Sequence, residues 1–128
     1  MTGPVFYITS KMRVWTHELP LDWSALEGFS FWLHGNNSGA KLNVDVIDNR
    51  KGCAIYDDAE RYRYEFVDDF SGWKKIVVKF SDMAREEIGN RAPNDGLRLS
   101  EVHEWGFGSA NKGQTTYYID DFELLGKP

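Results

Sequence analysis

The feature that most constrains this chain is a repeated alternation of apolar and polar residues with a period of two. The alternation is clear in the segments 29–34, 42–46, 61–66, 75–80 and 117–120. A period of two puts alternate side chains on opposite faces of a β-strand, so these segments are predicted strands with one apolar face.

Weaker strand candidates lie at 5–8, 13–17 and 103–109, and in the last of these Gly106 and Gly108 leave one face nearly bare.

Turn residues separate the predicted strands. The segment 35–39, Gly-Asn-Asn-Ser-Gly, is a strong hairpin signal, and 68–72 and 92–96 are further predicted turns. Residues 81–89 are expected to form a short helix, from a serine or aspartate cap to a closing glycine. Short strands at near-regular spacing, with little helix, predict an all-β fold: an antiparallel β-sandwich whose two sheets share one core.

Length and charge narrow the class of partner. The chain has 128 residues, and we expect a single domain over 1–128. Its formal net charge of -5 argues against nucleic acid or a membrane surface as partner. No stretch approaches the roughly 18 apolar residues of a membrane-spanning helix. The start of the sequence has no signal-peptide core, so any export information is expected elsewhere in a longer parent protein.

Catalytic motifs are not found. The three histidines stand outside any zinc-binding spacing, no Gly-x-Ser-x-Gly motif occurs, and the glycines of 106–113 lack the Gly-Lys-Ser/Thr ending of a phosphate loop. Most paired acids fit solvated turns, although those of 55–60 could bind sugar hydroxyls or calcium. We therefore expect no enzyme, which would need paired carboxylates or a Tyr, His and Arg cluster in one cleft.

The five tryptophans call for separate interpretations. Trp73 and Trp23 are expected to pack in the core. Trp32 lies on the polar face of its strand, so either a loop covers it or it is a binding platform. The pattern does not settle which way Trp15 and Trp105 face. An exposed ring of this kind can stack on the apolar face of a sugar, with neighbouring polar groups fixing the hydroxyls.

Several segments, in this order and at this spacing, resemble family-eleven carbohydrate-binding modules. They cover about residues 13–126 and are 22–24, 28–39, 59–66, 68–75, 79–83, 92–97 and 118–126. The resemblance implies a jelly-roll sandwich with a concave sheet that forms a cleft for a β-glucan-like chain. It also implies a non-catalytic domain of a bacterial glycoside hydrolase, acting outside the cell or in the periplasm to hold the catalytic domain near its polysaccharide.

The carbohydrate-binding residues that we expect combine this resemblance with the aromatic and charged pattern. They are Trp15, Trp32, Asp58, Arg61, Arg63, Arg85, His103 and Trp105. A family cleft acid falls on Asp58 and another cleft position falls near His103. Ile88 and Gly89 stand where the family has an aromatic residue, and Ser109 stands at a family tyrosine. The alternative is therefore a structural or protein-interaction sandwich that no longer binds sugar.

Two further expectations come from the resemblance. Asp120 and Asp121 match the family's calcium-binding region, so a structural calcium is an option there, and no other cofactor is expected. Family members begin with a further strand that this sequence lacks. A sheet edge left open in this way invites pairing with a second chain, so we expect some tendency to form a homodimer.

Overall fold

The computed structural model describes residues 5–8, 11–15, 22–48, 59–109 and 116–128, with the backbone alone described for 5–8, 11–15 and His103. These ranges contain strands joined by turns and two single 3-10 turns. The elements in chain order are β1 (Val5–Ile8), β2 (Lys11–Trp15), β3 (Leu26–Asn36), β4 (Lys41–Asp48), β5 (Arg61–Val67), β6 (Ser71–Lys79), η1 (Phe80–Asp82), β7 (Ala84–Glu86), η2 (Leu99–Glu101), β8 (Val102–Ser109) and β9 (Tyr117–Gly126).

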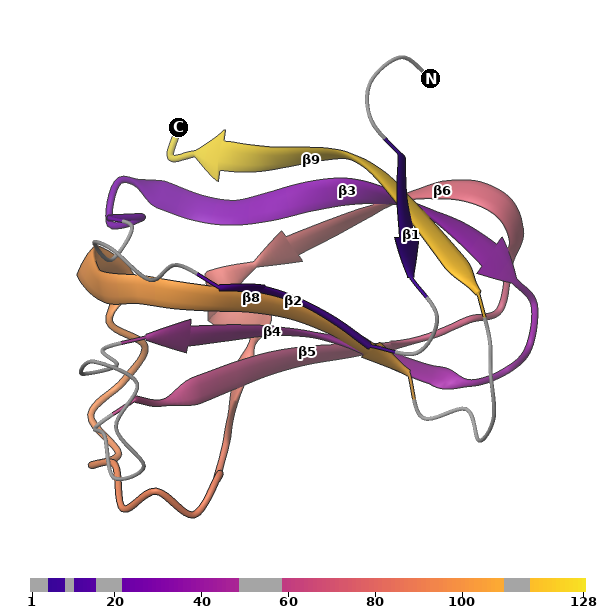
Figure 1. Ribbon diagram of the computed structural model, residues 1–128. Helices are drawn as coiled ribbons and strands as arrows, with labels where there is room; N and C mark the ends of the chain where they lie inside the picture. The colour runs from indigo at the N-terminus through magenta and orange to yellow at the C-terminus, as the bar shows by residue number, and fades with distance from the viewer. Residues whose placement is uncertain (1–4, 9–10, 16–21, 49–58, 110–115) are drawn as a thin grey trace.

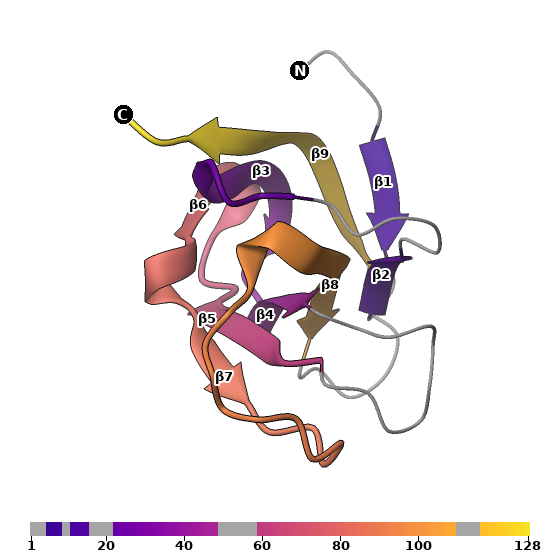
Figure 2. The ribbon, with the colours of Figure 1, turned by 90° about the vertical axis from the view of Figure 1, so that its left-hand side faces the viewer.

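The strands form two antiparallel sheets that lie one above the other (Figures 1 and 2). One sheet has four strands in the order β1-β9-β3-β6, and the other has five in the order β2-β8-β4-β5-β7. Every described pairing is antiparallel. The predicted all-β, antiparallel β-sandwich is therefore confirmed.

A single apolar core fills the space between the sheets. The four-stranded sheet contributes Phe29, Phe31 and Leu33 of β3, whereas the five-stranded sheet contributes the alternate residues of β4 and β8. Aromatic rings meet edge to face across the core, with the Phe31 and Trp105 centroids 5.9 Å apart. The period-two pattern of the sequence thus marks the faces that become the core.

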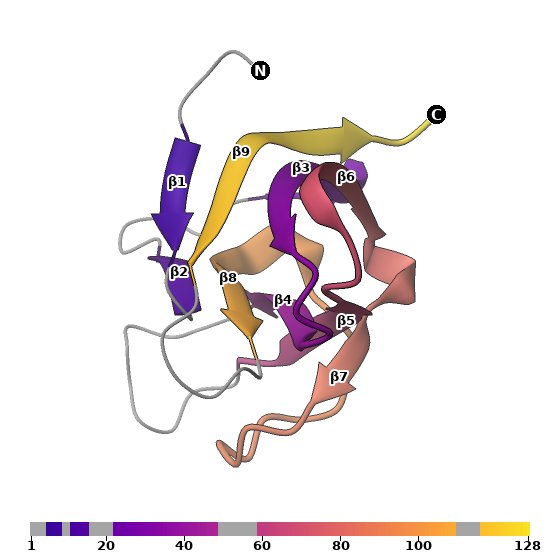
Figure 3. The same cartoon turned by 90° about the vertical axis from the view of Figure 1, so that its right-hand side faces the viewer.

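The segment 35–39 is not a hairpin, because β3 and β4 lie in different sheets. The chain crosses from one sheet to the other here, and it crosses back between β5 and β6. The two crossings run side by side in Figure 3 and are joined by backbone hydrogen bonds. Gly39 N donates to Asp68 O, and Asn37 N donates to Phe70 O. The turn chemistry was recognised, but turn residues serve a crossing as well as a hairpin.

The helix predicted at 81–89 is wrong. Only η1 is helical there, and the following residues form β7, which pairs with β5 from Arg61↔Glu86 to Arg63↔Ala84. Pairing with the edge of a sheet satisfies backbone groups that a helix of this length would leave open at its ends. Elsewhere the predicted strands are confirmed with shifted ends: β2 ends at Trp15 and residues 16–17 lie outside the described residues, β6 ends at Lys79, and several others extend further than the alternation showed. None of the helices in the described ranges is long and apolar enough to cross a membrane.

Candidate functional site

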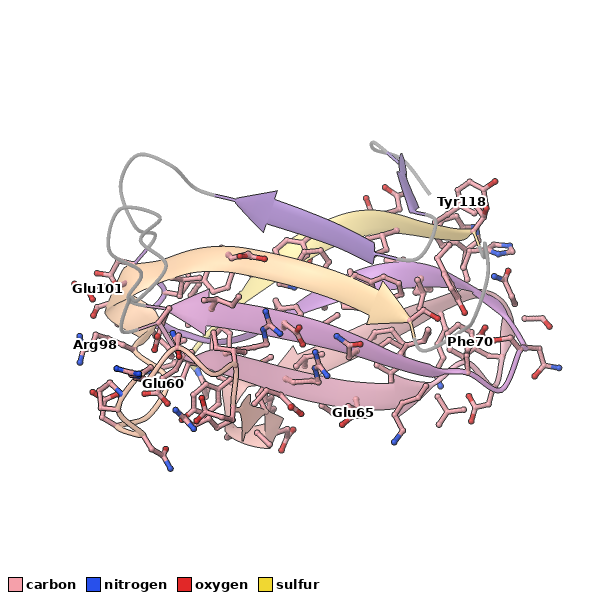
Figure 4. All side chains as sticks on the ribbon, turned by 60° about the horizontal axis from the view of Figure 1, so that its bottom comes forward. Glu60, Glu65, Phe70, Arg98, Glu101 and Tyr118 are labelled. Carbon is pink, nitrogen blue, oxygen red and sulfur yellow. The ribbon has the colours of Figure 1, made fainter. Side chains whose placement is uncertain are left out.

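The outer face of the five-stranded sheet carries a cluster of polar side chains from β4 and β5 (Figure 4). Leu42, Val44 and Val46 of β4 point into the core, so Asn43 and Asp45 between them point outward. The register places Arg63 of β5 directly opposite Asp45. Strand alternation therefore gathers these groups on one surface, away from the core.

Asp45 is the centre of this cluster. Its carboxylate accepts two hydrogen bonds from Arg63, Nε to Oδ1 at 2.8 Å and Nη2 to Oδ2 at 3.1 Å. Asn43 Nδ2 donates to Oδ1 at 3.1 Å, and Arg61 Nε lies 3.8 Å from Oδ2. The hydrogen bond to Asp45 is the main cause that raises the pKa of Arg63. The side chains are thus held in fixed directions, while Arg63 stays partly exposed.

Beside this cluster, β8 has no side chains at two positions of the same face. Gly106 pairs with Asp45, and Gly108 pairs with Asn43. We call these two residues the glycine strip. A Cβ on Gly108 would come within 2.9 Å of Asn43 Oδ1, so any side chain there would press on the cluster. Both glycines are buried, so the strip lies beneath neighbouring groups such as the Asn43 side chain and is not itself open surface.

Of the predicted carbohydrate-binding residues, Arg61 and Arg63 are brought together in this cluster. Two others belong to the same sheet by backbone register: Trp15 of β2 pairs with Glu104, and His103 lies in β8. Asp58 lies outside the described residues. The part of the prediction that rests on β2, β5 and β8 therefore falls on one sheet.

Arg85 is placed elsewhere, and its role differs from the prediction. It pairs with Tyr62 of β5, whose ring packs against the core, so it lies on the side of the sheet opposite to Arg63. Its Nε donates to Oε2 of the buried Glu60 at 2.7 Å, and Nη2 donates to Ala92 O. The Glu60 hydrogen bond is the main cause that raises the pKa of Arg85. Arg85 fastens the segment after β7 and does not lie with the outward cluster.

The tryptophans also differ from expectation. Trp105 is 6% exposed and packs on Phe29, Phe31 and Phe122, so it is a core residue and its prediction as a sugar platform is wrong. Trp73, expected in the core, is 39% exposed. Trp23 is buried as predicted.

Trp32 is half-buried in β3, opposite Lys75 of β6, and so belongs to the four-stranded sheet. It does not share a surface with the Asp45 cluster.

The predicted metal residues lie at a bulge of β9. Asp120 is buried, and its Oδ1 accepts the backbone N–H of Asp121, which has a positive φ of 52°. Oδ2 of Asp120 has no hydrogen-bond partner among the described residues. Within those same residues, no three His, Cys, Asp or Glu side chains are grouped so that they could hold a metal ion.

Two site residues, Asn43 and Asp45, were missed by sequence reasoning. The alternation of 42–46 already put them on the polar face, and the alternation of 61–66 did the same for the arginines. What the sequence lacked was the register that sets Asp45 against Arg63. Opposite charges on the outer faces of two predicted strands are the signal that could have paired them.

Comparison with known proteins places these observations in context. The chain matches the model of a family described as carbohydrate binding domain (family 11) over residues 12–127. Among solved structures it is similar to the family 11 carbohydrate-binding module of Clostridium thermocellum in complex with a β-1,3-1,4-mixed-linked tetrasaccharide. The two are 20% identical with a TM-score of 0.69, over 98% of this chain and 85% of that one.

Two further structures share the fold. The family 11 module of the cellulosomal cellulase Lic26A-Cel5E of Clostridium thermocellum is 20% identical with a TM-score of 0.66, over 99% of this chain and 84% of that one. PfGH50B is 14% identical with a TM-score of 0.62, over 97% of this chain but only 21% of its own. No curated protein sequence matches the chain. At these identities the structural likeness establishes the jelly-roll sandwich fold.

Proposed function

This chain belongs to the family 11 carbohydrate-binding domains, and from that premise we propose that it binds a β-glucan-like polysaccharide on the outer face of its five-stranded sheet. The family is one of binding domains, so the function is recognition and not catalysis. The observation that carries the choice of surface is the fixed Asp45–Arg63 pair on the outer face of β4 and β5, where Arg63 stays partly exposed.

Two properties of this surface suit a sugar chain. Asn43, Asp45 and Arg63 supply both donors and acceptors for hydroxyl groups. Because these side chains already hold one another, little rotamer entropy is lost when a ligand binds. One solved family 11 relative is in complex with a β-1,3-1,4-mixed-linked tetrasaccharide, which makes that class of glucan the first ligand to test.

The test is calorimetry with a mixed-linked β-1,3-1,4-glucan oligosaccharide, comparing the wild type with Arg63→Gln. We expect the substitution to weaken binding about tenfold or more, which corresponds to about 1.4 kcal/mol. Lys79→Gln is the control, since Lys79 is an exposed cation on β6 of the other sheet. Equal affinity of Arg63→Gln and wild type would move the site to another surface. No binding of any soluble glycan by the folded protein would support the alternative, a structural or protein-interaction sandwich.

The domain's role in a larger protein is a second part of the proposal. We propose that it is an exported accessory domain, extracellular or periplasmic, that holds a catalytic glycoside hydrolase domain near its polysaccharide. Supporting this, the fold occupies only 21% of the longer PfGH50B chain. Binding by this domain would raise the effective concentration of the polysaccharide at the linked catalytic domain. Deleting the domain from a parent enzyme is expected to lower activity on insoluble polysaccharide and to leave activity on short soluble oligosaccharides unchanged.

A structural calcium at Asp120 and Asp121 is also proposed. Its support is the buried Asp120 Oδ2, which lacks a partner among the described residues and would suit a hard cation. Calcium would then raise the melting temperature, and Asp120→Asn would abolish that rise. A melting temperature that is the same with calcium and with chelator would contradict the proposal.

For the homodimer, the sheet order points to one edge. β6, at one end of the four-stranded sheet, carries Lys74, Lys75 and Lys79, and charged lysines discourage edge pairing. The edge at β1 is therefore the proposed contact. Light scattering at high concentration tests it, and a strictly monomeric mass would count against it.

A further inference from the structure

The outer face of the four-stranded sheet carries a row of aromatic side chains that the proposed function does not use. In the backbone register, His34 of β3 lies opposite both Trp73 of β6 and Tyr118 of β9. The row continues in register to position 7 of β1, which is also a tyrosine. Each of the four strands thus contributes one aromatic residue at the same level, and we call this set the aromatic row.

The described rings of the aromatic row are held in position and yet open to solvent. The His34 ring meets Trp73 edge to face at 5.3 Å and Tyr118 edge to face at 6.0 Å. Trp73 is 39% exposed and Tyr118 is 38% exposed, which is unusual beside the buried rings of the core. Figure 4 shows Tyr118 well away from Glu65, which belongs to β5 of the other sheet. Fixed, exposed rings stack on ligands with little loss of rotamer entropy.

The surroundings of the row point to the charge of the ligand. On the same face, β6 continues from Trp73 through Lys75 and Val77 to Lys79, and all of these side chains are exposed. β6 has no acidic residue, whereas β9 contributes the buried Asp120 and the exposed Glu123 to this face, opposite Trp32 and Ser30. The β6 half of the face, around Trp73, is therefore the basic part. An anionic ligand is therefore favoured over a cationic one.

The extent of the row argues for a polymer of sugars over a protein partner. Neighbouring strands lie about 4.8 Å apart, so four positions span about 14 Å in one direction. A single line of rings flanked by lysines offers less surface area than the roughly 800 Å² that each partner buries in a stable protein interface. A narrow line of rings at right angles to the strands fits an extended chain of sugar rings.

We infer that the aromatic row is a second glycan-binding surface, on the opposite side of the sandwich from the Asp45 cluster, and that it takes an acidic polysaccharide. Trp73 and Tyr118 stack on sugar rings, and Lys75 attracts the carboxylates. A domain with one such surface on each side can bridge two chains or bind a mixed wall material more tightly than either surface could alone.

The test uses polygalacturonate and alginate as acidic chains and a mixed-linked β-1,3-1,4-glucan as a neutral one. Trp73→Ala and Tyr118→Ala are each expected to weaken binding to one of the acidic chains about tenfold while leaving glucan binding unchanged. Arg63→Gln should do the reverse. Val77→Ala is the control, since Val77 lies on the same face of β6 and has no ring. If the protein binds an acidic chain but not the glucan, the site at the Asp45 cluster is contradicted and the aromatic row is still supported.

The role of charge is tested by Lys75→Glu. This substitution should weaken binding to the acidic chain, and the loss of affinity should be larger at low salt than at high salt. If no polysaccharide responds to Trp73→Ala, the inference is overturned. It is also overturned if Trp73→Ala abolishes binding to the neutral chain only, or disrupts only association with a protein domain of a parent enzyme. Because Trp73 is exposed, its substitution is expected to leave the melting temperature nearly unchanged, and this is checked first.

Discussion

The hydroxyl of Tyr117 donates a hydrogen bond to Oδ2 of Asp68 at 3.0 Å and ties the start of β9 to the crossing between β5 and β6. Ser38 Oγ donates to the same oxygen at 2.6 Å, while Oδ1 accepts the backbone N–H groups of Asn36 and Asn37. One buried carboxylate therefore holds both crossings between the sheets and the strand that follows them.

Replacing this carboxylate should be costly. Asp68→Ala leaves the buried Tyr117 hydroxyl and several part-buried donors without their acceptor, so the free energy of unfolding is expected to fall by about 3 kcal/mol. Tyr117→Phe removes one donor and should lower it by only about 1 kcal/mol. Urea unfolding with an unchanged m-value measures both. An Asp68→Ala domain as stable as the wild type would show that the corner is held by other contacts.

Acid should weaken the same corner. Burial by itself raises the pKa of Asp68, but hydrogen bonds from Ser38, Asn36 and Tyr117 outweigh it and hold the pKa below its ordinary value. The stability that Asp68 contributes is therefore present above its unfolded pKa of about 3.9 and is lost as the pH falls through the lower folded value. The Asp68→Asn domain should lose less stability in this window than the wild type, as measured by urea unfolding at a series of acidic pH values.

The contribution of Asp48 to stability changes with pH in the opposite direction to that of Asp68. Burial raises the pKa of Asp48, against hydrogen bonds from the backbone N–H groups of Arg98 and Glu60. Its share of stability is therefore lost as the pH rises from about 3.9 toward the higher folded pKa. Asp48→Asn serves as the contrasting variant for the acid series, because it removes this opposing contribution and should steepen the net acid loss.

The strands were largely predictable from the sequence, and their surroundings were not. Alternation identified two faces for each strand, and in β3, β4 and β5 it identified the core face as well. It did not show that 35–39 crosses between sheets, because Asn37 and Gly39 adopt the same positive φ that a hairpin turn requires. Long-range pairing decides this, and no local pattern contains it.

The tryptophans show the same limit at the level of single side chains. Trp73 was expected in the core and is exposed, whereas Trp105 was a predicted binding residue whose facing the pattern left open, and it is buried. In β8, Trp105 and Phe107 alternate with Gly106 and Gly108, so one parity gives the core two aromatic rings and the other gives it a bare face. Register with β4, where Trp105 pairs with Val46, selects the buried choice. The same limit applies to the candidate site: of the residues in the Asp45 cluster, the sequence pattern alone identified only Arg61 and Arg63.

Glu60 is expected to matter for stability and not for ligand binding. Its Oε2 accepts Arg85 Nε and its Oε1 accepts the backbone N–H of Asp95, so it joins β7 to the segment that follows. Glu60 is almost fully buried, and Glu60→Ala should lower the free energy of unfolding by about 3 kcal/mol. Calorimetry with glucan at a temperature where the variant is folded should give an unchanged affinity. A selective loss of affinity would mean that Arg85 and its segment contribute to the site after all.

The glycine strip can be probed by adding a single methyl group. In Gly108→Ala the new Cβ would lie 2.9 Å from Asn43 Oδ1, so the Asn43 side chain must move away from Asp45. The end of a side chain shifts easily, so the melting temperature should change little. Glucan affinity should fall about tenfold, because the Asn43 side chain, a hydrogen-bonding group of the cluster, is displaced. Asn43→Ala tests this cause directly, and a full affinity in Gly108→Ala would contradict a role for Asn43 in binding.

Trp105 and Trp32 are expected to respond to truncation in different ways. Trp105→Ala removes a ring that packs on Phe29 and Phe31 between the sheets, so the free energy of unfolding should fall by about 4 kcal/mol. Trp32 lies half-buried on the other sheet, and Trp32→Ala should leave glucan binding unchanged, since its strand pairs with β6 and β9 and not with the strands of the Asp45 cluster. Guanidinium unfolding and calorimetry on both variants separate these effects. A stable Trp105→Ala domain that no longer binds glucan would restore Trp105 as a binding residue, because a core ring cannot be removed without a loss of stability.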